Sequence, residues 1–315
     1  NRRKELMACI LITGGTGFIG TTVAKELRSQ GHKVKLMDLS TKRKTDPNFY
    51  GGSILDPYRV STVMRGCDYV VHLAAALGVR RTEARRLECL YINIEGTVNV
   101  LEACVKENVK KIVFSSSSET YGNQNKSPIT EKSPVNPISN YATTKLVGEE
   151  YLRAYYENYH LKYSIVRFFN VYGEEQKDDF VIPKFVNSIC EKKPPVIYGN
   201  GKQVRSFCYV SDAAKGIVAA LFGENSTGEV FNIGNDQQPI SMQELAEKIV
   251  SISGEKDIVP EFIPMEDSDR TKEREVFNRI PSIEKAKKML NYHPEISLNE
   301  GIRRVIEYKR SLNEK

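Results

Sequence analysis

Several features are missing from the sequence, and each absence argues against a class of protein. No apolar run approaches the ~18 residues of a membrane span, and the first six residues lack the apolar core of a secretion signal. The six cysteines are widely spaced without a Cys-x-x-Cys pair, as is typical of buried thiols in a reducing compartment. The four histidines show no metal-ligand spacing. We therefore expect a cytoplasmic protein with no metal site and no membrane contact.

Blocks of like charge are also scarce. The formal net charge of +6 comes from lysines and arginines scattered over 315 residues, apart from a short basic stretch at residues 1–4. A solvated surface accounts for most of this charge, so we expect no nucleic-acid partner, although a mild positive field suits an anionic substrate. The length allows one large domain or two smaller ones, and an interleaved apolar content of 40% predicts a globular fold.

A glycine-rich turn follows the first apolar segment of the chain. Residues 7–13 are an apolar run expected for a buried strand, and Gly-Gly-Thr-Gly-Phe-Ile-Gly occupies residues 14–20 directly after it. Residues 21–30 have helical spacing, and a second strand is expected at residues 33–37. In this order an open backbone and a helix N-terminus can receive a pyrophosphate, which predicts a dinucleotide site.

An acidic residue ends the second expected strand. Asp38 lies eighteen residues after Gly20, close to the position where an acid holds the hydroxyls of an adenosine ribose. A carboxylate there also repels a 2′-phosphate, so NAD is favoured over NADP. Lys42, Arg43 and Lys44 lie just beyond and could soften that preference.

Strands and helices alternate about six times in the first half of the chain, which predicts an α/β fold with a doubly wound parallel sheet. Small residues at 74–76 would leave room for a cofactor at the end of one strand. Asn93 lies in an otherwise apolar helix face, and we expect it to bridge to the serine-rich strand, a structural role. The expected strands are residues 51–55, 69–73, 111–114 and 163–168, and the expected helices residues 57–65 and 87–107.

The serine-rich strand and the helix after it carry the candidate chemistry. Four serines at 115–118 and Glu119 follow the strand, and Tyr141 and Lys145 are then spaced for one helical face. A fixed cation near a phenol lowers its pKa and makes it a better base. By itself the Tyr–Lys spacing favours an ordinary surface helix with a chance spacing, so the interpretation depends on the rest of the chain.

The pattern changes after Gly173, where turn-rich pieces and amphipathic helices replace the regular alternation. We predict a dinucleotide-binding domain at residues 7–173, to which residues 204–232 return. Residues 174–203 and 233–315 are expected to form a smaller C-terminal α/β lobe over the carboxyl edge of the sheet, where a substrate would be clamped.

Taken together, these motifs make the chain resemble the extended short-chain dehydrogenases, specifically the NAD-dependent nucleotide-sugar epimerase/dehydratase group with its Rossmann fold. The resemblance covers nearly the whole chain, from Met7 to about Tyr308. The matching motifs are Gly14-x-x-Gly17-x-x-Gly20, Asp38, His72-Leu73-Ala74-Ala75, Asn93-x-x-Gly96-Thr97, Ser115 to Ser117 before Tyr121-Gly122, Tyr141-x-x-x-Lys145, Arg167 to Gly173, and Gly199-x-Gly201-x-x-x-Arg205.

The resemblance implies a role for each matching residue. Tyr141 would be the general base that takes the proton from a sugar hydroxyl, usually O4, while hydride leaves C4 for NAD. Lys145 would lower the Tyr141 pKa and hold the nicotinamide ribose, and Ser117 would hydrogen-bond the reacting oxygen. The implied cofactor contacts are Gly14, Thr16, Gly17, Phe18, Ile19, Gly20, Asp38, Asp56, Leu73, Ala74, Ala75, Tyr141 and Lys145. The implied contacts to a nucleotide-activated sugar are Ser117, Ser118, Asn170, Arg205 and Arg270, with Arg274 as an alternative to Arg270.

The sequence also departs from the family pattern. The Asp that often reads the adenine is Ser53 here, and Asp56 is the residue expected to compensate. The Asp of the family's Arg-Asp-Phe is Ser206, and the usual Asp of a C-terminal Asp-Ile-x-Lys-Ala motif is Ser282. These changes leave the expected fold and cofactor untouched but weaken any inference about the nucleotide.

Glu119 bears on which reaction follows C4 oxidation. The run Ser117-Ser118-Glu119 resembles the Thr-Ser-Glu of GDP-mannose 4,6-dehydratases and UDP-glucuronate decarboxylases, and the Thr-Asp-Glu of dTDP-glucose 4,6-dehydratases. In a 4,6-dehydratase this acid removes the C5 proton, and water leaves from C6. A carboxylate in a partly dry cleft has a raised pKa and can shuttle protons. The alternative is that Glu119 caps the loop or pairs with a nearby cation.

The leading hypothesis is therefore an enzyme that forms a 4-keto sugar and ends as an epimerase or a 4,6-dehydratase, in polysaccharide biosynthesis. Alternatives are decarboxylation of a nucleotide-activated uronic acid, with Arg80, Arg81 or Arg270 clamping the carboxylate, and net oxidation at C4. A catalytically idle NAD-binding regulator is the alternative outside enzymes. The family also implies a homodimer, built from helices at residues 87–107 and 141–159.

Overall fold

A central parallel sheet organises the molecule. The computed structural model describes residues 7–40, 44–264 and 276–313, apart from the side chains of residues 79–81 and 313. Seven strands pair in the order β11-β6-β5-β4-β1-β2-β3, and every pairing is parallel, which confirms the predicted sheet. The strands are β1 (Cys9–Thr13), β2 (Lys33–Asp38), β3 (Phe49–Gly51), β4 (Tyr69–His72), β5 (Lys111–Ser117), β6 (Lys162–Phe168) and β11 (Glu229–Ile233).

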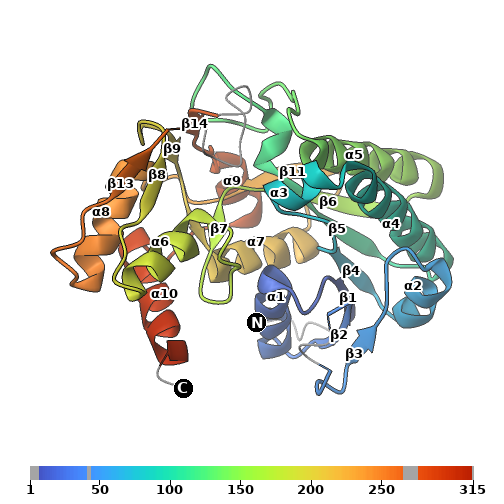
Figure 1. The fold of residues 1–315 in the computed structure, drawn as a ribbon. Coiled ribbons are helices and arrows are strands. Elements are labelled where there is room, and N and C mark those ends of the chain that lie inside the picture. The colour runs from blue at the N-terminus through green and yellow to red at the C-terminus, as the bar shows by residue number, and fades with distance from the viewer. Residues whose placement is uncertain (1–6, 41–43, 265–275, 314–315) are drawn as a thin grey trace.

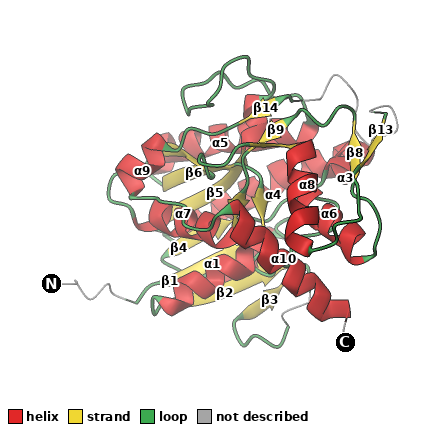
Figure 2. Cartoon of the chain, turned by 90° about the vertical axis from the view of Figure 1, so that its left-hand side faces the viewer, coloured by secondary structure: helices red, strands yellow, loops and turns green. Residues whose placement is uncertain are grey.

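Helices cover both faces of the sheet (Figures 1 and 2). Alternate residues of β1 show why. Ile10 and Ile12 belong to the apolar core on one face, Leu11 belongs to the core on the other, and all three are fully buried. The first face carries α1 (Phe18–Ser29), α7 (Val210–Phe222) and α9 (Glu284–Leu290). The second face carries α2 (Pro57–Met64), α4 (Arg86–Lys106) and α5 (Asn140–Tyr159).

One predicted strand is displaced. The sequence pattern predicts residues 51–55, whereas β3 is Phe49–Gly51 and ends there. Residues after it form a tight turn, in which the Ser53 hydroxyl accepts a hydrogen bond from the Leu55 N–H at 3.1 Å. Asp56 then begins α2 as its N-cap, so no residues remain to extend the strand.

The C-terminal lobe has its own core and three small sheets. Its helices are α6 (Val181–Cys190), α8 (Met242–Ser253) and α10 (Leu298–Asn313), whose apolar faces meet in one cluster. The small sheets pair β7 (Val171–Tyr172) with β10 (Cys208–Tyr209), β8 (Val196–Tyr198) with β13 (Glu261–Ile263), and β9 (Val204–Arg205) with β12 (Ile240–Ser241) and β14 (Asn278–Arg279). Phe18 and Ile19, at the start of α1, pack against this lobe core and so bring the lobe next to the glycine turn.

The strand order reverses beside β1, because the chain proceeds from β1 to β2 on one side and returns to β4 on the other. At such a switch point the loops after neighbouring strands separate, and ligands of open α/β sheets bind there, outside the carboxyl ends of the strands. The glycine turn and the loop after β4 begin at this edge, and the serine-rich strand β5 ends there. No described helix is long and apolar enough to cross a membrane, and the six cysteines are all free thiols.

Candidate active site

The glycine turn joins β1 to α1 in very little space. Gly14 has a positive φ of 70°, and the N–H groups of Gly14 and Gly15 donate to the Met37 carbonyl at 2.8 and 3.2 Å. A Cβ on Gly14 would lie 2.8 Å from the Ala74 nitrogen, and one on Gly20 would lie 2.3 Å from the Gly14 carbonyl oxygen. Only glycine therefore allows β1, α1 and the end of β4 to approach this closely.

The turn fits the pyrophosphate of a dinucleotide. Gly17 is the N-cap of α1 and supplies no side-chain cap, so the first N–H groups of the helix have no capping partner. The Thr16 hydroxyl is buried and has no hydrogen-bond partner among the described residues. Unpaired donors at a helix N-terminus are the groups that bind phosphate oxygens. Gly14, Thr16, Gly17, Phe18, Ile19 and Gly20 thus lie together, as the sequence predicts.

Asp38 lies beside the same turn, at the end of β2. Its Oδ2 accepts a hydrogen bond from the Thr16 N–H at 3.1 Å, and its Oδ1 accepts one from the Ser40 N–H at 3.0 Å. The carboxylate is therefore fixed at the edge of the phosphate turn, on the side where the adenosine half of a dinucleotide is expected. Lys42 and Arg43 lie outside the described residues. Asp56 is an exposed N-cap of α2 that accepts from the Arg59 N–H at 2.9 Å, and its adenine contact stays a prediction.

Asn93 has a structural role, but its partners differ from the expected ones. Its Oδ1 accepts from the Ala76 N–H at 2.7 Å, and its Nδ2 donates to the Ala76 carbonyl at 3.1 Å and to Thr144 Oγ1 at 3.0 Å. The predicted bridge to the serine strand is wrong, because the amide instead closes the loop after β4 and joins α4 to α5. Leu73, Ala74 and Ala75 in that loop are consequently held over the carboxyl edge of the sheet.

The buried His72 supports the same loop. One ring nitrogen lies 2.6 Å from Thr13 Oγ1 and the other lies 3.1 Å from Thr97 Oγ1. Burial and, to a smaller extent, the nearby Lys145 charge lower the pKa of His72 to about 3, so the imidazole is neutral at physiological pH. His72 thus acts as a neutral hydrogen-bonding link between β1, β4 and α4.

The candidate catalytic residues meet where β5 ends. Ser117 is the last residue of β5, and its Oγ accepts from the Glu119 N–H at 3.1 Å in the short helix η1 (Ser118–Tyr121). Ser139 is the N-cap of α5 and donates to Glu119 Oε2 at 3.0 Å. Glu119 is therefore bonded to the cap of the helix that carries Tyr141, which agrees with the capping alternative and does not remove the carboxylate from the site.

Lys145 is 3% exposed and lies one helical turn after Tyr141. Its Nζ is 4.9 Å from the centroid of the Phe114 ring and 5.6 Å from that of the Tyr141 ring. Burial lowers the pKa of Lys145 to about 8, while Cys89 and Glu149 partly oppose this shift. The ammonium is consequently close to titration near neutral pH.

The pKa of Tyr141 is raised, in the opposite direction to the one that the Tyr–Lys spacing predicts. Burial is the largest cause, and electrostatic interactions with Glu119 and then Cys89 add to it. Lys145 lies over the ring face, where it cannot offset the desolvation of the phenolate. The prediction of a lowered pKa is therefore wrong for the protein alone, and further positive charge is needed to ionise the phenol.

The expected substrate contacts are distributed along the lobe side of the site. Asn170 has a positive φ of 39° and donates through Nδ2 to the Ser206 carbonyl at 2.9 Å. Arg205 is buried and donates to the carbonyls of Phe277 at 3.2 Å and Val276 at 2.5 Å. Ser118 is buried within η1. Arg270 and Arg274 lie outside the described residues, as do the side chains of Arg80 and Arg81, so their roles stay predictions.

Sequence reasoning missed Glu149, which is fully buried in α5. Its carboxylate accepts hydrogen bonds from the hydroxyl of Ser116 at 2.5 Å and from Nε and Nη2 of Arg167 at 2.9 and 2.6 Å. A signal was present, because Glu149 follows Lys145 at the same four-residue spacing that separates Lys145 from Tyr141.

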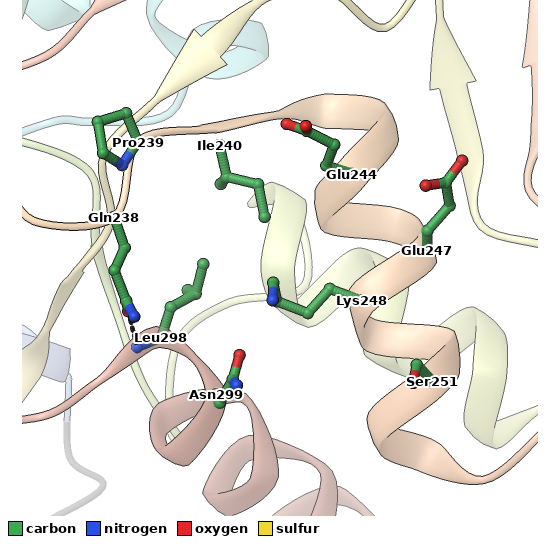
Figure 3. Close-up of a pocket in the computed structure, with 9 residues that line it drawn as sticks. All are labelled: Gln238, Pro239, Ile240, Glu244, Glu247, Lys248, Ser251, Leu298 and Asn299. Carbon is green, nitrogen blue, oxygen red and sulfur yellow. Dashed lines mark hydrogen bonds between the residues drawn. The ribbon is translucent and has the colours of Figure 1, made fainter.

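A separate hollow of about 590 Å³ is lined by residues of α8, of the start of α10 and of the segment before α8 (Figure 3). Lys248 of α8 and Asn299 of α10 face it from opposite sides. None of its lining residues belongs to the glycine turn or the serine strand, so it is not the candidate active site. The lining residues are Gln238, Pro239, Ile240, Glu244, Glu247, Lys248, Ser251, Leu298 and Asn299.

A doubly wound sheet, a glycine turn with an acid at the end of β2, and Ser117, Tyr141 and Lys145 at the end of β5 define a dinucleotide-dependent short-chain dehydrogenase. The sequence model of the "NAD dependent epimerase/dehydratase family" matches residues 10–234. The chain belongs to this family, and its cofactor is NAD.

Similar proteins cover nearly the whole chain. A "Putative UDP-glucose 4-epimerase" of Methanocaldococcus jannaschii is 36% identical, over 96% of this chain and 99% of that protein. A "UDP-N-acetyl-alpha-D-glucosaminuronate decarboxylase" of Bacillus cytotoxicus is 35% identical, over 96% of this chain and 98% of that one. The solved UDP-glucose 4-epimerase of Thermotoga maritima, with UDP-glucose, superposes with a TM-score of 0.89 at 32% identity, over 97% of this chain and 99% of that chain.

Proposed function

We propose that this enzyme oxidises a uridine diphosphate sugar at C4 and then reduces the 4-keto sugar from its other face, giving the C4 epimer. The observation that carries the proposal is the convergence of Ser117, Tyr141 and Lys145 at the carboxyl end of β5. Uridine is supported by the names of similar proteins, which include a UDP-glucose 4-epimerase and a UDP-glucuronate 4-epimerase. The resulting sugar would serve polysaccharide biosynthesis.

In the proposed mechanism, Tyr141 is the general base that takes the O4 proton, and Ser117 holds O4 by a hydrogen bond. Lys145 favours the Tyr141 phenolate through its positive charge. When bound, NAD supplies the hydride acceptor for C4, and its nicotinamide ring carries a positive charge that also favours the phenolate. Gly14, Gly17 and the start of α1 would hold its pyrophosphate, and Asp38 its adenosine ribose. Because Lys145 is buried, its charge acts with little screening by water.

Dehydration between C5 and C6 is a second candidate outcome, and Glu119 favours it. The carboxylate is bonded to the Ser139 cap of α5 and acts electrostatically on Tyr141, so it lies close to the phenol. From this position Glu119 would accept the C5 proton, which a C4 ketone makes acidic, and pass it to the departing C6 hydroxyl, so that water is lost. The hydride removed from C4 would then be returned to C6. Decarboxylation of a uronic acid, release of the 4-keto sugar and an idle regulator remain as outcomes of the test.

A panel of UDP-, GDP-, CDP- and dTDP-sugars tests the proposal. We expect UDP-sugars to give transient absorbance of reduced nicotinamide, together with a product of unchanged mass and inverted C4. Loss of one water would instead assign dehydration, and loss of carbon dioxide decarboxylation. Tight NAD binding with no reduced nicotinamide from any sugar would favour the regulator and refute the proposal.

Glu119→Gln separates epimerisation from dehydration. If Glu119 only supports Ser139, the N-cap of α5, the variant keeps the same product and loses little rate, because an amide oxygen can still accept the Ser139 hydrogen bond. If Glu119 removes the C5 proton, C4 oxidation persists while dehydration is lost. Glu157→Gln, an exposed residue near the end of α5, is the matched control.

A homodimer and a cytoplasmic location belong to the same proposal. The dimer would use the exposed sides of α4 and α5, on which large apolar side chains remain uncovered. The six free thiols support a reducing compartment.

A further inference from the structure

The carboxylate of Glu149 joins three elements of the site. Glu149 is 0% exposed and lies on the face of α5 that also carries Tyr141 and Lys145. Its two oxygens receive one hydrogen bond from Ser116 of β5 and two from Arg167 of β6. An Arg–carboxylate pair with two parallel hydrogen bonds fixes orientation as well as distance.

The two partners of Glu149 are themselves neighbours in the sheet. Ser116 and Arg167 are paired in the register of β5 and β6. Ser116 directly precedes Ser117, which is expected to hold the reacting oxygen, and Arg167 lies three residues before Asn170. Glu149 therefore sets the position of α5 relative to the two strand ends that carry expected substrate contacts.

A contribution to stability does not by itself explain the buried ion pair of Glu149 and Arg167. Replacing a buried ion pair with apolar residues of similar volume is often neutral or stabilising, because two charges have to be removed from water. Loss of one partner is costly, since it leaves an uncompensated buried charge. The network continues through Arg167, whose guanidinium lies 4.7 Å from the centroid of the Tyr121 ring, to the hydrogen bond from Tyr121 to Asn232 at 2.7 Å.

Glu149 also supplies negative charge next to Lys145. The titratable groups that act on Lys145 are Cys89 of α4 and Glu149 itself, and Lys145 in turn acts on His72 of β4. Tyr141 lies beside the ammonium on α5. On the other side, Glu149 faces Arg167 and Arg153, the latter at 3.5 Å, and Tyr121 of η1.

We propose that Glu149 is a positioning residue for C4 oxidation, holding Tyr141 and Lys145 in place against Ser117 and supplying the negative charge next to Lys145. The expected change in kcat rests on the proposed function, because it presupposes that the enzyme oxidises a sugar at C4. It concerns how the catalytic pair is held and leaves the nature of the product open.

Glu149→Gln is the first test, with Glu150→Gln as the matched control. Glu150 follows directly on α5, but its side chain is 66% exposed and pairs only with Arg153 at the surface. Misplacement of catalytic groups by ~1 Å can cost about 100-fold in rate, so we expect Glu149→Gln to lower kcat by about 10- to 100-fold with KM unchanged. Glu150→Gln should behave as the wild type.

The pH profile of Glu149→Gln should also move. The substitution removes a negative charge and leaves the Arg167 charge unpaired, and both changes disfavour the Lys145 ammonium. The rate should therefore begin to fall at a lower pH than in the wild type. A purely structural role would lower the rate equally at every pH and would overturn the proposal.

The double variant Glu149→Leu/Arg167→Met keeps the test decisive if Glu149→Gln folds poorly. It removes both buried charges together, so we expect thermal stability close to that of the wild type. Its kcat should nevertheless remain as low as that of Glu149→Gln, because α5 is no longer tied to β5 and β6. Wild-type kcat in the folded double variant would overturn the proposal.

A measurement without turnover separates this proposal from the proposed function. The ionisation of Lys145 can be followed by NMR on protein labelled at the lysine ε-carbons, with Lys145→Arg identifying its signal. We expect a lower Lys145 pKa in Glu149→Gln than in the wild type and no change in Glu150→Gln. If no nucleotide sugar is oxidised, the proposed function fails, whereas an unchanged Lys145 pKa in Glu149→Gln overturns the role of Glu149.

Discussion

At the level of single residues, the site combines two opposed requirements. Tyr141 has to give up its proton to act as a base, yet burial and the Glu119 charge raise its pKa. Lys145 has to stay charged, yet burial lowers its pKa to about 8. Desolvation is the largest cause of both shifts, and charges in such surroundings act strongly on their neighbours. The phenolate consequently depends on the positive charges of Lys145 and of the bound nicotinamide.

Tyr141→Phe tests the first requirement. The substitution removes only the hydroxyl, so the fold and NAD binding should persist while C4 oxidation falls by about 10²- to 10⁴-fold, the usual contribution of a general base. Single-turnover absorbance of reduced nicotinamide measures the step. Tyr159→Phe, on the exposed end of the same helix, should leave the rate unchanged. More than a tenth of the wild-type rate in Tyr141→Phe would show that another group takes the proton.

The pH dependence of C4 oxidation tests the second requirement. A lysine whose pKa is lowered from 10.5 to about 8 loses its charge as the pH rises through about 8. The rate should therefore fall above pH about 8, because the neutral amine no longer favours the phenolate.

Lys145→Arg is the control for this assignment. Arginine keeps its charge at every accessible pH, so the alkaline fall should disappear even if the rate is lower throughout. An unchanged alkaline fall in Lys145→Arg would assign that titration to a different group.

At the level of elements, the chemistry depends on how closely α5 approaches β5. Gly148 of α5 lies against the ring of Phe114, and a Cβ on Gly148 would be 2.5 Å from that ring. Phe114 is 1% exposed and also carries the Lys145 ammonium over its face. Gly148, which lies between Lys145 and Glu149 on α5, therefore sets the distance between α5 and β5.

Gly148→Ala should push α5 away from β5. Overpacking of this kind costs about 1–3 kcal/mol, offset by up to ~1 kcal/mol from the better helix propensity of alanine. We expect a lower urea midpoint and slower C4 oxidation, because Lys145 moves with the helix. Glu157→Ala, an exposed residue of the same helix, should change stability by less than about 0.5 kcal/mol. If Gly148→Ala were more stable and fully active, the Phe114 ring would have to move aside to accommodate the added Cβ.

Local patterns account for the part of this architecture that can be predicted from the sequence. The buried run before the glycine turn, the alternation of strands and helices and the spacing of Tyr141 and Lys145 are all features of neighbouring residues, and each corresponds to an element in the structure. The candidate site was predictable in part, because Tyr141 and Lys145 follow from a helix face, whereas Ser117 was selected by the family resemblance.

The remainder depends on contacts between distant parts of the chain. Whether Asn93 reaches Ala76 or the serine strand is decided by how α4 lies on the sheet. The pairing of Glu149 with Arg167 depends on the register of β5 and β6 and on the position of α5 above these strands. The raised pKa of Tyr141 follows from burial, which spacing along a helix does not specify. Similarly, Arg205 meets the carbonyls of residues 276 and 277 because β9 pairs with β14.

At the level of the whole molecule, α4 and α5 lie side by side on one flank of the sheet (Figure 1). Their inner faces fill the core, but their outer faces carry uncovered apolar side chains. Leu87 and Tyr91 of α4 are 83% and 62% exposed and lie one helical turn apart, and Tyr151 of α5 is 37% exposed. Exposed apolar residues are ordinary when scattered singly, whereas several on two neighbouring helices are consistent with an interface.

The proposed dimer is tested by placing charge on this surface. Leu87→Arg/Tyr91→Arg should give a monomer in light scattering coupled to chromatography, since two desolvated cations from each copy would face each other across the axis. Tyr58→Arg on α2, at a position 82% exposed, should leave the dimer intact. Ser117, Tyr141 and Lys145 all come from one chain, so the monomeric variant should still bind NAD and oxidise the sugar. A monomeric wild type at working concentration would contradict the dimer and leave the active-site assignment untouched, because the two rest on opposite faces of α4 and α5.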